Sequence, residues 1–510
     1  MPQTLDYPGV YVNEIPSGSR AITGVATSIT AFVGRAARGP VDRPVTINSW
    51  AEYEQQFGGL WRVSGLGYAI RDFFLNGGGT AIILRLAGGA TASTLNAGGL
   101  ALQAYGPGVW GDRLEVDIAH PEPGDAAEVA TAQGVEPDDL FHLTVREGEA
   151  EDPDTTESFL NVTVADGPRR VDLVLAGSRL IRVDGNLPAT RPAEGTYTVQ
   201  AAGTGTDSAE LTGNDYRGIG VDGDGLDALR QVDLFNLLCL PPSTLTGNLP
   251  DDVWADAMGL CVDRNAMLLV DPPSGTVRDD ILAWLGARGL SGTSARNAAF
   301  YFPRLRAPDP LRGGTAGDFV PCGAVAGVMA RTDATRGVWK APAGTEAGLV
   351  AVIAPAETMT DRQNGVLNVK GVNCVRAFRD TGSVVWGART LRGADSLADE
   401  YKYVPVRRIA LFLKESLYRG TQWAVFEPND APLWAQIRTS LGAFMQDLFR
   451  QGAFQGSTPR EAYFVKCDAE TTTQYDIDRG IVNILVGFAP LKPAEFVVVG
   501  IQQKTATATG

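Results

Sequence analysis

Two stretches of the chain alternate apolar runs with amphipathic segments, which is the pattern of an α/β layer. In the first stretch, the apolar runs ITAFVGRA at 29–36 and TAIILRLA at 80–87 predict buried strands. Between them, Ser49 followed three residues later by Glu52 is a capping-box signal for the start of a helix. The segment 66–79 predicts an amphipathic helix that is stopped by its glycines.

The second stretch runs from about residue 225 to 305 and repeats this alternation. Apolar runs predict buried strands at 234–242, 266–273 and 297–305. Helical segments come before or between them, at 226–232, 251–265 and 276–289. Strands and helices that alternate at this spacing favour a mainly parallel sheet. The two stretches therefore predict one central α/β domain, formed by residues 26–90 and 216–360.

Residues 91–215 lie between these halves and predict a β-rich inserted domain. Short alternating runs between turn-rich pieces predict strands at 113–119, 141–147, 159–165 and 178–184. From Asn96 to Asp215, 22 Asp and Glu stand against 7 Arg and no Lys, a net charge of −15. One interpretation is a well-solvated surface domain. Another is an outer domain that faces bulk solvent in an assembly.

The last third of the chain predicts a separate α+β core over residues 366–493. Helices are predicted at 406–420 and from Asn429 or Asp430 onward, since either residue can cap the second helix and Pro432 suits its first turn. Its apolar positions form one stripe of residues: Leu433, Ile437, Leu441, Phe444 and Leu448. Strands are predicted at 462–468, 480–490 and 493–503, the last within a C-terminal strand arm over 494–510.

The N-terminus also predicts a strand that lies outside any domain pattern. In YPGVYVNEI at 7–15, Val10 and Val12 alternate with Tyr11 and Asn13. The Pro16–Ser19 stretch predicts a joint after this strand, within an N-terminal arm over residues 1–25. A lone strand exposes unpaired N–H and C=O groups and requires a sheet edge. We therefore expect both chain ends to pair with the edges of neighbouring copies.

Charge and cysteine usage limit the partners and the compartment. A net charge of −15 argues against a nucleic-acid partner. No apolar run approaches the roughly 20 residues that span a bilayer, which predicts no direct membrane insertion. The N-terminal sequence lacks the features of a secretion signal, so we expect the chain to be made and folded in a cytoplasm. The widely spaced cysteines are interpreted as buried reduced thiols: Cys239, Cys261, Cys322, Cys374 and Cys467.

Catalytic and cofactor motifs are not found, so we predict no catalytic residue, no cofactor and no metal. The two histidines, His120 and His142, both lie in the acidic insertion without a local cysteine, which argues against a His-based triad or a zinc site. No GxxxxGK[ST] phosphate loop is present. Sequence alone leaves an Asp/Glu hydrolytic pair open.

Several long strings give the chain a family resemblance. They begin with YPGVYVNEI and TAFVGRAARGPVDRPVTINSWAEYEQQFG, resume with VPCGAVAGVMARTDATRGVWKAPAG at 320–344, and are strongest in GVNCVRAFRDTGSVVWGARTL and in YKYVPVRRIALFLKESLYRGTQWAVFEPNDAPLWAQIR. GSTPREAYFVKCD and LKPAEFVVVGIQQ close the match. In this order the strings resemble the contractile tail sheath family of phages and related injection systems. Within the insertion 91–215, only GPGVWGDRLEV matches.

This resemblance implies a multidomain α/β and α+β subunit with a C-terminal sheath core, terminal strand arms, a central α/β domain and a β-rich inserted outer domain. It implies that copies form hexameric rings or a helical lattice around an inner tube, between a baseplate and terminator or cap proteins. It also implies that such a sheath contracts and drives the tube through a target envelope, as part of a phage tail or a tail-like particle released by lysis.

The residues expected to make these contacts lie in the arms and on one helix. The inter-subunit arm residues are Val10, Tyr11, Val12, Asn13, Glu14, Phe496, Val497, Val498 and Val499. Arg438 and Arg450, on the helix predicted at 431–451, are candidates for the tube-facing surface. Two alternatives stay open: an α/β hydrolase-like enzyme with a β-rich insertion, and another phage structural protein.

Overall fold

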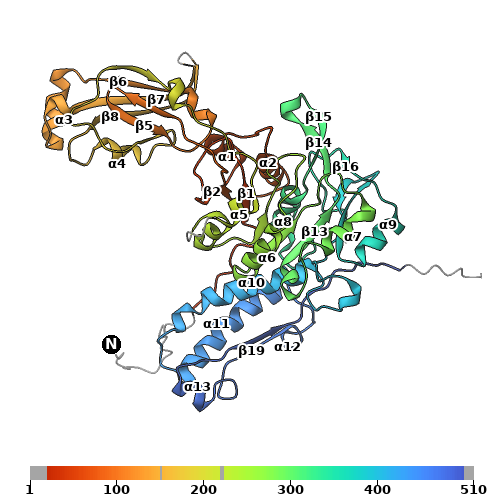
Figure 1. The fold of residues 1–510 in the computed structure, drawn as a ribbon. Helices are drawn as coiled ribbons and strands as arrows, with labels where there is room; N and C mark the ends of the chain where they lie inside the picture. Colours follow the sequence, from red (N-terminus) through yellow and green to blue (C-terminus); the bar gives the residue numbers. More distant parts are fainter. Residues whose placement is uncertain (1–19, 150–151, 219–222, 499–510) are drawn as a thin grey trace, which may run out of the picture. The chain divides into compact units, whose positions relative to one another are not determined.

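The fold was described from a computed structural model of the chain, which describes residues 20–149, 152–218 and 223–498. Contacts divide the chain into two units. The C-terminal unit comprises Met1–Val25 and Ile409–Lys492, and the central unit comprises Ala26–Arg408 and Pro493–Gly510. The fold is mixed α/β with several sheets (Figure 1). Six of the nine predicted arm residues lie outside the described residues: Val10, Tyr11, Val12, Asn13, Glu14 and Val499.

An eight-stranded sheet forms the core of the central unit. Its strands, in spatial order, are β18 (Gly382–Val385), β17 (Val372–Phe378), β13 (Ala298–Phe302), β12 (Met267–Val270), β11 (Leu237–Cys239), β1 (Thr30–Gly34), β3 (Ala81–Arg85) and β2 (Val45–Ile47). All neighbours from β17 to β3 are parallel, and the two edge strands are antiparallel. The predicted parallel sheet is confirmed. Because β1 and β3 precede the insertion and β11 follows it, the insertion interrupts one sheet.

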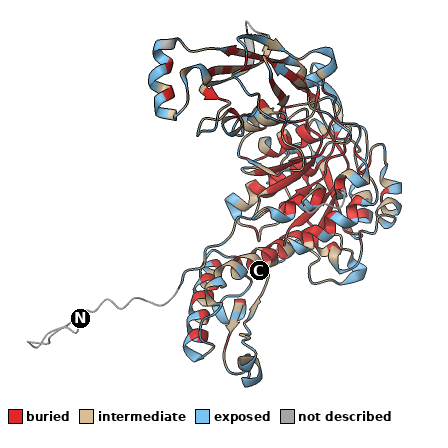
Figure 2. Ribbon diagram, turned by 60° about the vertical axis from the view of Figure 1, so that its left-hand side comes forward, coloured by how far each residue is buried: buried red, intermediate tan, exposed pale blue. Residues whose placement is uncertain are grey.

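Helices cover both faces of this sheet, so its strands are buried on both sides (Figure 2). One face packs on α6 (Val253–Asp263) and α7 (Arg278–Gly286). The other packs on α1 (Trp50–Phe57), α2 (Leu66–Leu75) and α8 (Cys322–Arg336). The remaining elements are α5 (Gly213–Arg217), α9 (Asp361–Asn368) and a small sheet of β14 (Leu305–Asp309), β15 (Thr315–Phe319) and β16 (Ala354–Pro355).

The predicted boundary between the central domain and the C-terminal core, at 360–366, is wrong. β17 and β18 lie after this boundary, yet β17 pairs in parallel with β13 through Phe300 and Val372. Val372 and Cys374 are fully buried in the same core as β12 and β13. The sheet therefore continues to Val385, and the second unit begins at Ile409. The segment 226–232, predicted as an α-helix, forms a 3-10 helix over Gly225–Gln231.

The insertion forms two sheets around one apolar core. One sheet contains β10 (Gly195–Thr198), β6 (Leu114–Ala119), β7 (Leu140–Glu149) and β8 (Asp152–Thr163). The other contains β4 (Thr94–Ala97), β5 (Leu100–Ala104) and β9 (Ile181–Val183). The four predicted strands are present. Two helices, α3 (Pro123–Gln133) and α4 (Val171–Leu175), were not predicted; the turn-rich piece at 120–125 opens α3, with Pro123 in its first turn.

The C-terminal unit packs long helices on a two-stranded sheet. α10 (Val404–Gly420) carries the chain into it, followed by α11 (Ala431–Arg450), α12 (Pro459–Ala462), β19 (Tyr463–Lys466), α13 (Gln474–Asp478) and β20 (Leu485–Phe488). The predicted cap of α11 is confirmed, because the Asp430 side chain accepts a hydrogen bond from Leu433 N at 3.1 Å. The predicted apolar stripe of α11 is buried. Residues 493–498, predicted as the start of a strand, form none within a single copy.

Candidate functional site

The sheet of β19 and β20 is open at both edges. Among the described residues, each of its strands pairs with no strand other than its partner. One face packs on α11, where Val465, Val486 and the buried Cys467 contact Leu433, Ile437 and Leu441. On the other face, Phe464 and Leu485 are each 53% exposed. Packing on α11 stabilises this two-stranded sheet, but it leaves the strand edges and the other face open.

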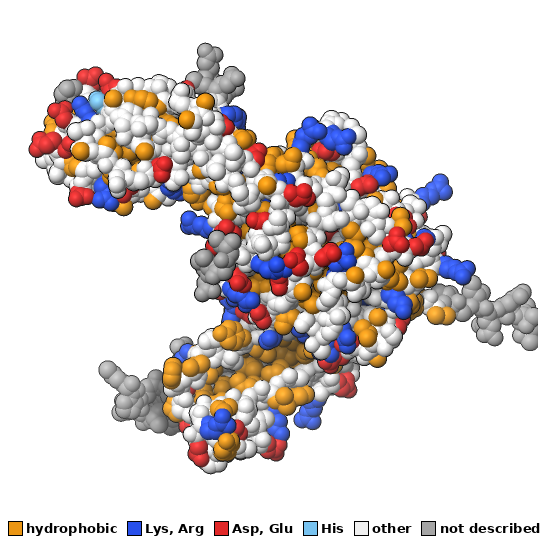
Figure 3. Space-filling view, in the orientation of Figure 1, with side chains coloured by type: hydrophobic (Ala, Val, Ile, Leu, Met, Phe, Trp, Pro, Cys, Tyr) orange, Lys and Arg blue, Asp and Glu red, His pale blue; other side chains and the backbone are white. Residues whose placement is uncertain are grey.

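This open sheet differs in burial from every interior strand of the central sheet. No residue of β19 or β20 is buried, whereas β1 and β3 are buried at every position (Figure 2). Hydrophobic side chains gather in a hollow beside α11 on the C-terminal unit (Figure 3). An exposed strand edge with apolar side chains on its open face is a template for a strand from another chain.

The last described part of the N-terminal arm, residues 20–25, is anchored on the C-terminal unit. The Arg20 guanidinium lies 5.1 Å from the centre of the Trp423 ring. A Cβ added at Gly24 would lie 2.9 Å from the Phe412 ring, so glycine permits the chain to pass this close. Val25 N donates to Ser416 Oγ at 3.1 Å. The described end of the N-terminal arm therefore lies on the C-terminal unit.

The C-terminal arm is anchored instead on the central unit, through Glu495. Both carboxylate oxygens accept hydrogen bonds from the fully buried Arg389, at 2.6 and 2.7 Å. Tyr403 Oη donates to Glu495 at 3.1 Å, and Asn368 Nδ2 donates at 3.3 Å. Burial raises the pKa of Glu495, but the hydrogen bonds and charge of Arg389 outweigh it and hold that pKa below its usual value. We call these four side chains the Glu495 clamp.

The three apolar residues that follow the clamp are exposed in the part of the chain that the structure describes. Phe496, Val497 and Val498 are 72%, 82% and 94% exposed. Apolar side chains of this size are normally buried when a partner is present, because their contact with water is unfavourable. The sequence did not single out Glu495, Arg389 or Arg20, although the two strand-like chain ends pointed to the segments beside them.

Of the two candidate tube-facing residues, Arg438 is engaged within its own unit. Its guanidinium donates to the Cys467 carbonyl, next to β19. Arg450, in the last turn of α11, keeps 72% of its side chain exposed, with Asp447 at 3.8 Å as its ion-pair partner. The structure therefore leaves Arg450, rather than Arg438, available at a surface.

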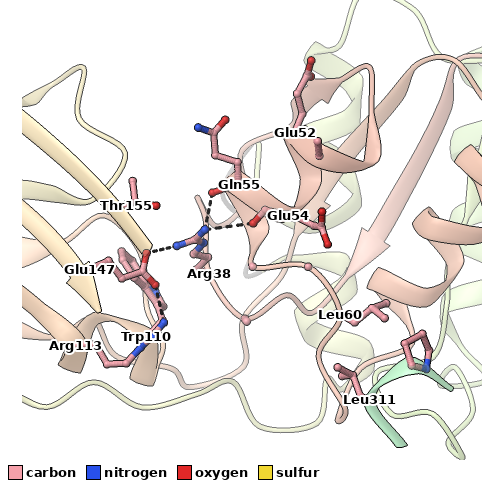
Figure 4. A pocket seen from close by; sticks show the side chains of 15 residues that line it. Arg38, Glu52, Glu54, Gln55, Leu60, Trp110, Arg113, Glu147, Thr155 and Leu311 are labelled. Carbon is pink, nitrogen blue, oxygen red and sulfur yellow. Dashed lines mark hydrogen bonds and ion pairs between the residues drawn. The ribbon is translucent and has the colours of Figure 1, made fainter. Parts of the chain in front are cut away.

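A cavity of about 930 Å³ lies where the insertion meets the body of the central unit (Figure 4). Arg38 donates to the buried Glu147 carboxylate across this junction, and Arg113 donates to the same carboxylate at 2.8 Å. The cavity lining contains no histidine or cysteine, and Thr155 supplies its hydroxyl group. The described lining therefore presents no nucleophile beside a histidine base.

The two histidines and the cysteines take part in ordinary packing. His142 Nδ1 accepts from Asn161 N at 3.0 Å, and His120 Nε2 lies 2.8 Å from the Pro192 carbonyl oxygen. All five cysteines are buried and unpaired, as the sequence predicted. Among the described residues, no group of three or more His, Cys, Asp and Glu side chains is placed to bind a metal ion. In the same residues, no helix has the length and apolar character of a membrane span.

Two family models match the chain in succession. The phage tail sheath protein central domain matches residues 209–391, and the phage tail sheath C-terminal domain matches residues 398–504. Together they cover more than half of the 510 residues. The chain belongs to the phage tail sheath family. The central-domain match ends after β18, and the C-terminal match contains the open sheet and extends into the C-terminal arm.

Relatives and solved structures agree with this family. The tail sheath protein of Enterobacteria phage T4 is 26% identical over 264 residues, which are 51% of this chain and 38% of that protein. The chain spans less than half the length of the curated relatives it matches. A sheath protein of the extracellular contractile injection system PVC, in its contracted state, has a TM-score of 0.59 at 22% identity, covering 98% of this chain and 99% of that one. A sheath tail protein from Listeria innocua gives 0.60 at 13% identity, covering 92% and 96%. These two structures share the fold.

Proposed function

We propose that this chain is the subunit of a contractile sheath, in which copies polymerise around an inner tube by exchanging strands. The observation that carries this proposal is the open β19–β20 sheet together with the uncovered apolar segment Phe496–Val498. A donor strand and an acceptor edge on one chain are complementary in the way that strand addition requires. Membership of the sheath family favours this structural role over a hydrolase-like enzyme.

Strand exchange supplies enough free energy to hold a lattice. A strand of about five residues contributes four or five backbone hydrogen bonds at about 0.5–1.5 kcal/mol each. Each fully buried apolar side chain of the arm adds roughly 1.5–3 kcal/mol. In this proposal Val10–Glu14 and Phe496–Val499 are the exchanged strands, and each copy is linked to its neighbours by two arms.

The two arms would connect different units of different copies. The N-terminal arm starts from the C-terminal unit at Arg20, whereas the C-terminal arm starts from the central unit at Glu495. Since the acceptor sheet belongs to the C-terminal unit, the C-terminal arm joins the central unit of one copy to the C-terminal unit of another. Units linked in this way can reorient as rigid bodies while the strands stay paired.

This proposal also assigns positions in the sheath to the insertion, the C-terminal unit and the partner proteins. The acidic insertion lies outermost, and the C-terminal unit faces the tube, with Arg450 of α11 at the contact. Hexameric rings stack between a baseplate and a terminator or cap protein. Contraction releases energy stored during assembly, so the sheath itself binds no nucleotide. The particle, a phage tail or a tail-like device, assembles in a bacterial cytoplasm and leaves by lysis.

Removal of the N-terminal arm tests the proposal. A chain without residues 1–18 keeps the anchored segment that begins at Arg20, so we expect a folded subunit. We also expect this subunit to form no sheaths under negative-stain electron microscopy, in conditions where the full chain does. Normal sheaths from the truncated chain would show that the N-terminal strand is not exchanged. The melting temperature of the truncated subunit is the control for folding.

A further inference from the structure

The loop between α10 and α11 contains a turn whose backbone does not suit the residue that occupies it. After the 3-10 helix Gln422–Ala424, the backbone N–H of Glu427 donates to the Ala424 carbonyl at 3.3 Å. Val425 has φ −69° and ψ 131°, and Phe426 has φ 67°. A negative φ with extended ψ followed by a positive φ is the geometry of a type II turn. Its third position favours Gly or Asn, because other side chains are strained at positive φ.

Nothing described in the subunit compensates for placing a phenylalanine at this position. The Phe426 side chain is 103% exposed, and the neighbouring Val425 is 59% exposed. The ring therefore contributes neither to a core nor to the turn, and it adds backbone strain. Single exposed apolar residues are common on protein surfaces, but they do not normally occupy left-handed backbone positions.

The residues before and after this turn are nevertheless anchored by contacts with the rest of the unit. The Trp423 ring, three residues before Phe426, carries the Arg20 guanidinium at 5.1 Å. On the other side, Asn429 Nδ2 donates to the Ile481 carbonyl at 3.0 Å, and Asn429 Oδ1 accepts from Trp434 Nε1 at 2.9 Å. Asp430 caps α11. A loop backbone that is anchored before binding loses little conformational entropy on contact, and this favours an aromatic docking residue at its tip.

We propose that Phe426 is a docking residue that inserts its ring into an apolar pocket on a neighbouring copy of this chain. A second copy is chosen as the partner because the proposed strand exchange joins residues 10–14 to a neighbouring copy, and Arg20, ten residues after Val10, lies against Trp423 beside the turn. The copy that receives the arm therefore approaches this loop. The inference rests on the proposed polymerisation and adds a second contact to the exchanged strand.

The decisive variant is Phe426→Gly, because the two possible roles of the ring predict opposite results. Glycine at positive φ removes the strain, so we expect the melting temperature of the isolated subunit to rise by about 2 °C. The loss of the docking ring raises the critical concentration for sheath assembly at least about tenfold, measured by sedimentation of the full-length chain. A purely structural residue cannot give greater subunit stability together with weaker assembly.

Tyr475→Ala is the matched control, because Tyr475 is an aromatic residue of the same unit that is 67% exposed on α13. We expect it to leave the critical concentration within about twofold of the original chain. If Phe426→Gly assembles as well as this control, or melts several degrees lower than the original chain, the inference is wrong. Failure of the unaltered chain to assemble would instead contradict the proposed sheath function.

A photo-cross-linking residue at position 426 tests the choice of partner. p-Benzoylphenylalanine keeps an aromatic ring at this position and reacts with whatever C–H groups lie beside it. In assembled sheaths we expect dimers of this chain, and none from the unassembled subunit. A cross-link to the inner tube protein in place of a second copy would overturn the assignment.

Discussion

The eight-stranded sheet of the central unit and the two-stranded sheet of the C-terminal unit differ in how far their strands and faces are covered. In the central sheet, every interior strand has two neighbours and helices cover both faces. In the C-terminal sheet, each strand has one neighbour among the described residues, and Phe464 and Leu485 are exposed on one face. Backbone groups at a strand edge require partners. The first sheet is covered within one chain, and we propose that the second is completed by strands from other chains.

Substitutions in the two sheets should therefore change the free energy of unfolding of the isolated subunit by very different amounts. Leu269 of β12 is fully buried, so Leu269→Ala leaves a cavity and lowers the free energy of unfolding by about 2–5 kcal/mol. Phe464 lies on the open face, so Phe464→Ser changes the free energy of unfolding by less than about 0.5 kcal/mol. Urea denaturation of both variants measures the difference. Equal destabilisation would mean that the open face is already covered within one copy.

The Glu495 clamp attaches the start of the C-terminal arm to the central unit. In the proposed assembly, this arm completes the β19–β20 sheet of another copy. Glu495→Gln removes the charge that compensates the buried Arg389 and weakens the attachment of the arm by about 2–4 kcal/mol. We expect faster proteolysis of the C-terminal tail, a lower stability of the central unit around Arg389 and weaker sheath assembly.

Glu346→Gln is the control for this variant. Glu346 forms an exposed ion pair with Arg336 in the same unit, and exposed pairs contribute little to stability. A tail that resists protease equally in both variants would show that the clamp does not fix the arm.

The buried Asp271 gives the central unit a pH-dependent stability. Burial raises the pKa of its carboxyl to about 7, from 3.8 for an unperturbed aspartate, and the contacts of Cys322 and Arg304 oppose this only in part. The folded state therefore binds the proton more tightly, and its stability falls as pH rises between these values. From pH 5 to pH 7 we expect a loss of about 2 kcal/mol. Asp271→Asn should remove this contribution and leave that of Asp72, whose pKa burial also raises to about 7. Asp138→Asn, at a 96% exposed carboxylate, should leave both contributions in place. A stability independent of pH in the unaltered chain would contradict this.

Sequence patterning predicts the central sheet well because its elements are continuous apolar runs at regular spacing. The runs at 29–36, 80–87 and 297–305 each contain a strand that is buried on both faces. The domain boundary was predicted too close to the N-terminus. The reason is that the chain forms β14–β16 and α9 before β17 returns to the central sheet. Which sheet a strand joins depends on tertiary pairing, and a local pattern does not contain this information.

The site was predicted less completely, for a related reason. The strand-like chain ends pointed to Phe496–Val498, and these residues are uncovered. Glu495 looked like one more residue of that strand, because its partner Arg389 lies 106 positions away in the sequence. Phe426 sits in WAVFEPND, where Pro428 and Asn429 indicate a turn, but only the backbone angles place it at the position that favours glycine.

A cryo-electron microscopy structure of the assembled sheath tests most directly whether the open sheet is completed by other copies. We predict that β19 and β20 gain strands at their edges, formed by residues 10–14 of one neighbour and 496–499 of another. Chain ends folded back onto their own subunit, with both edges of β19–β20 still unpaired in the assembled state, would contradict the account.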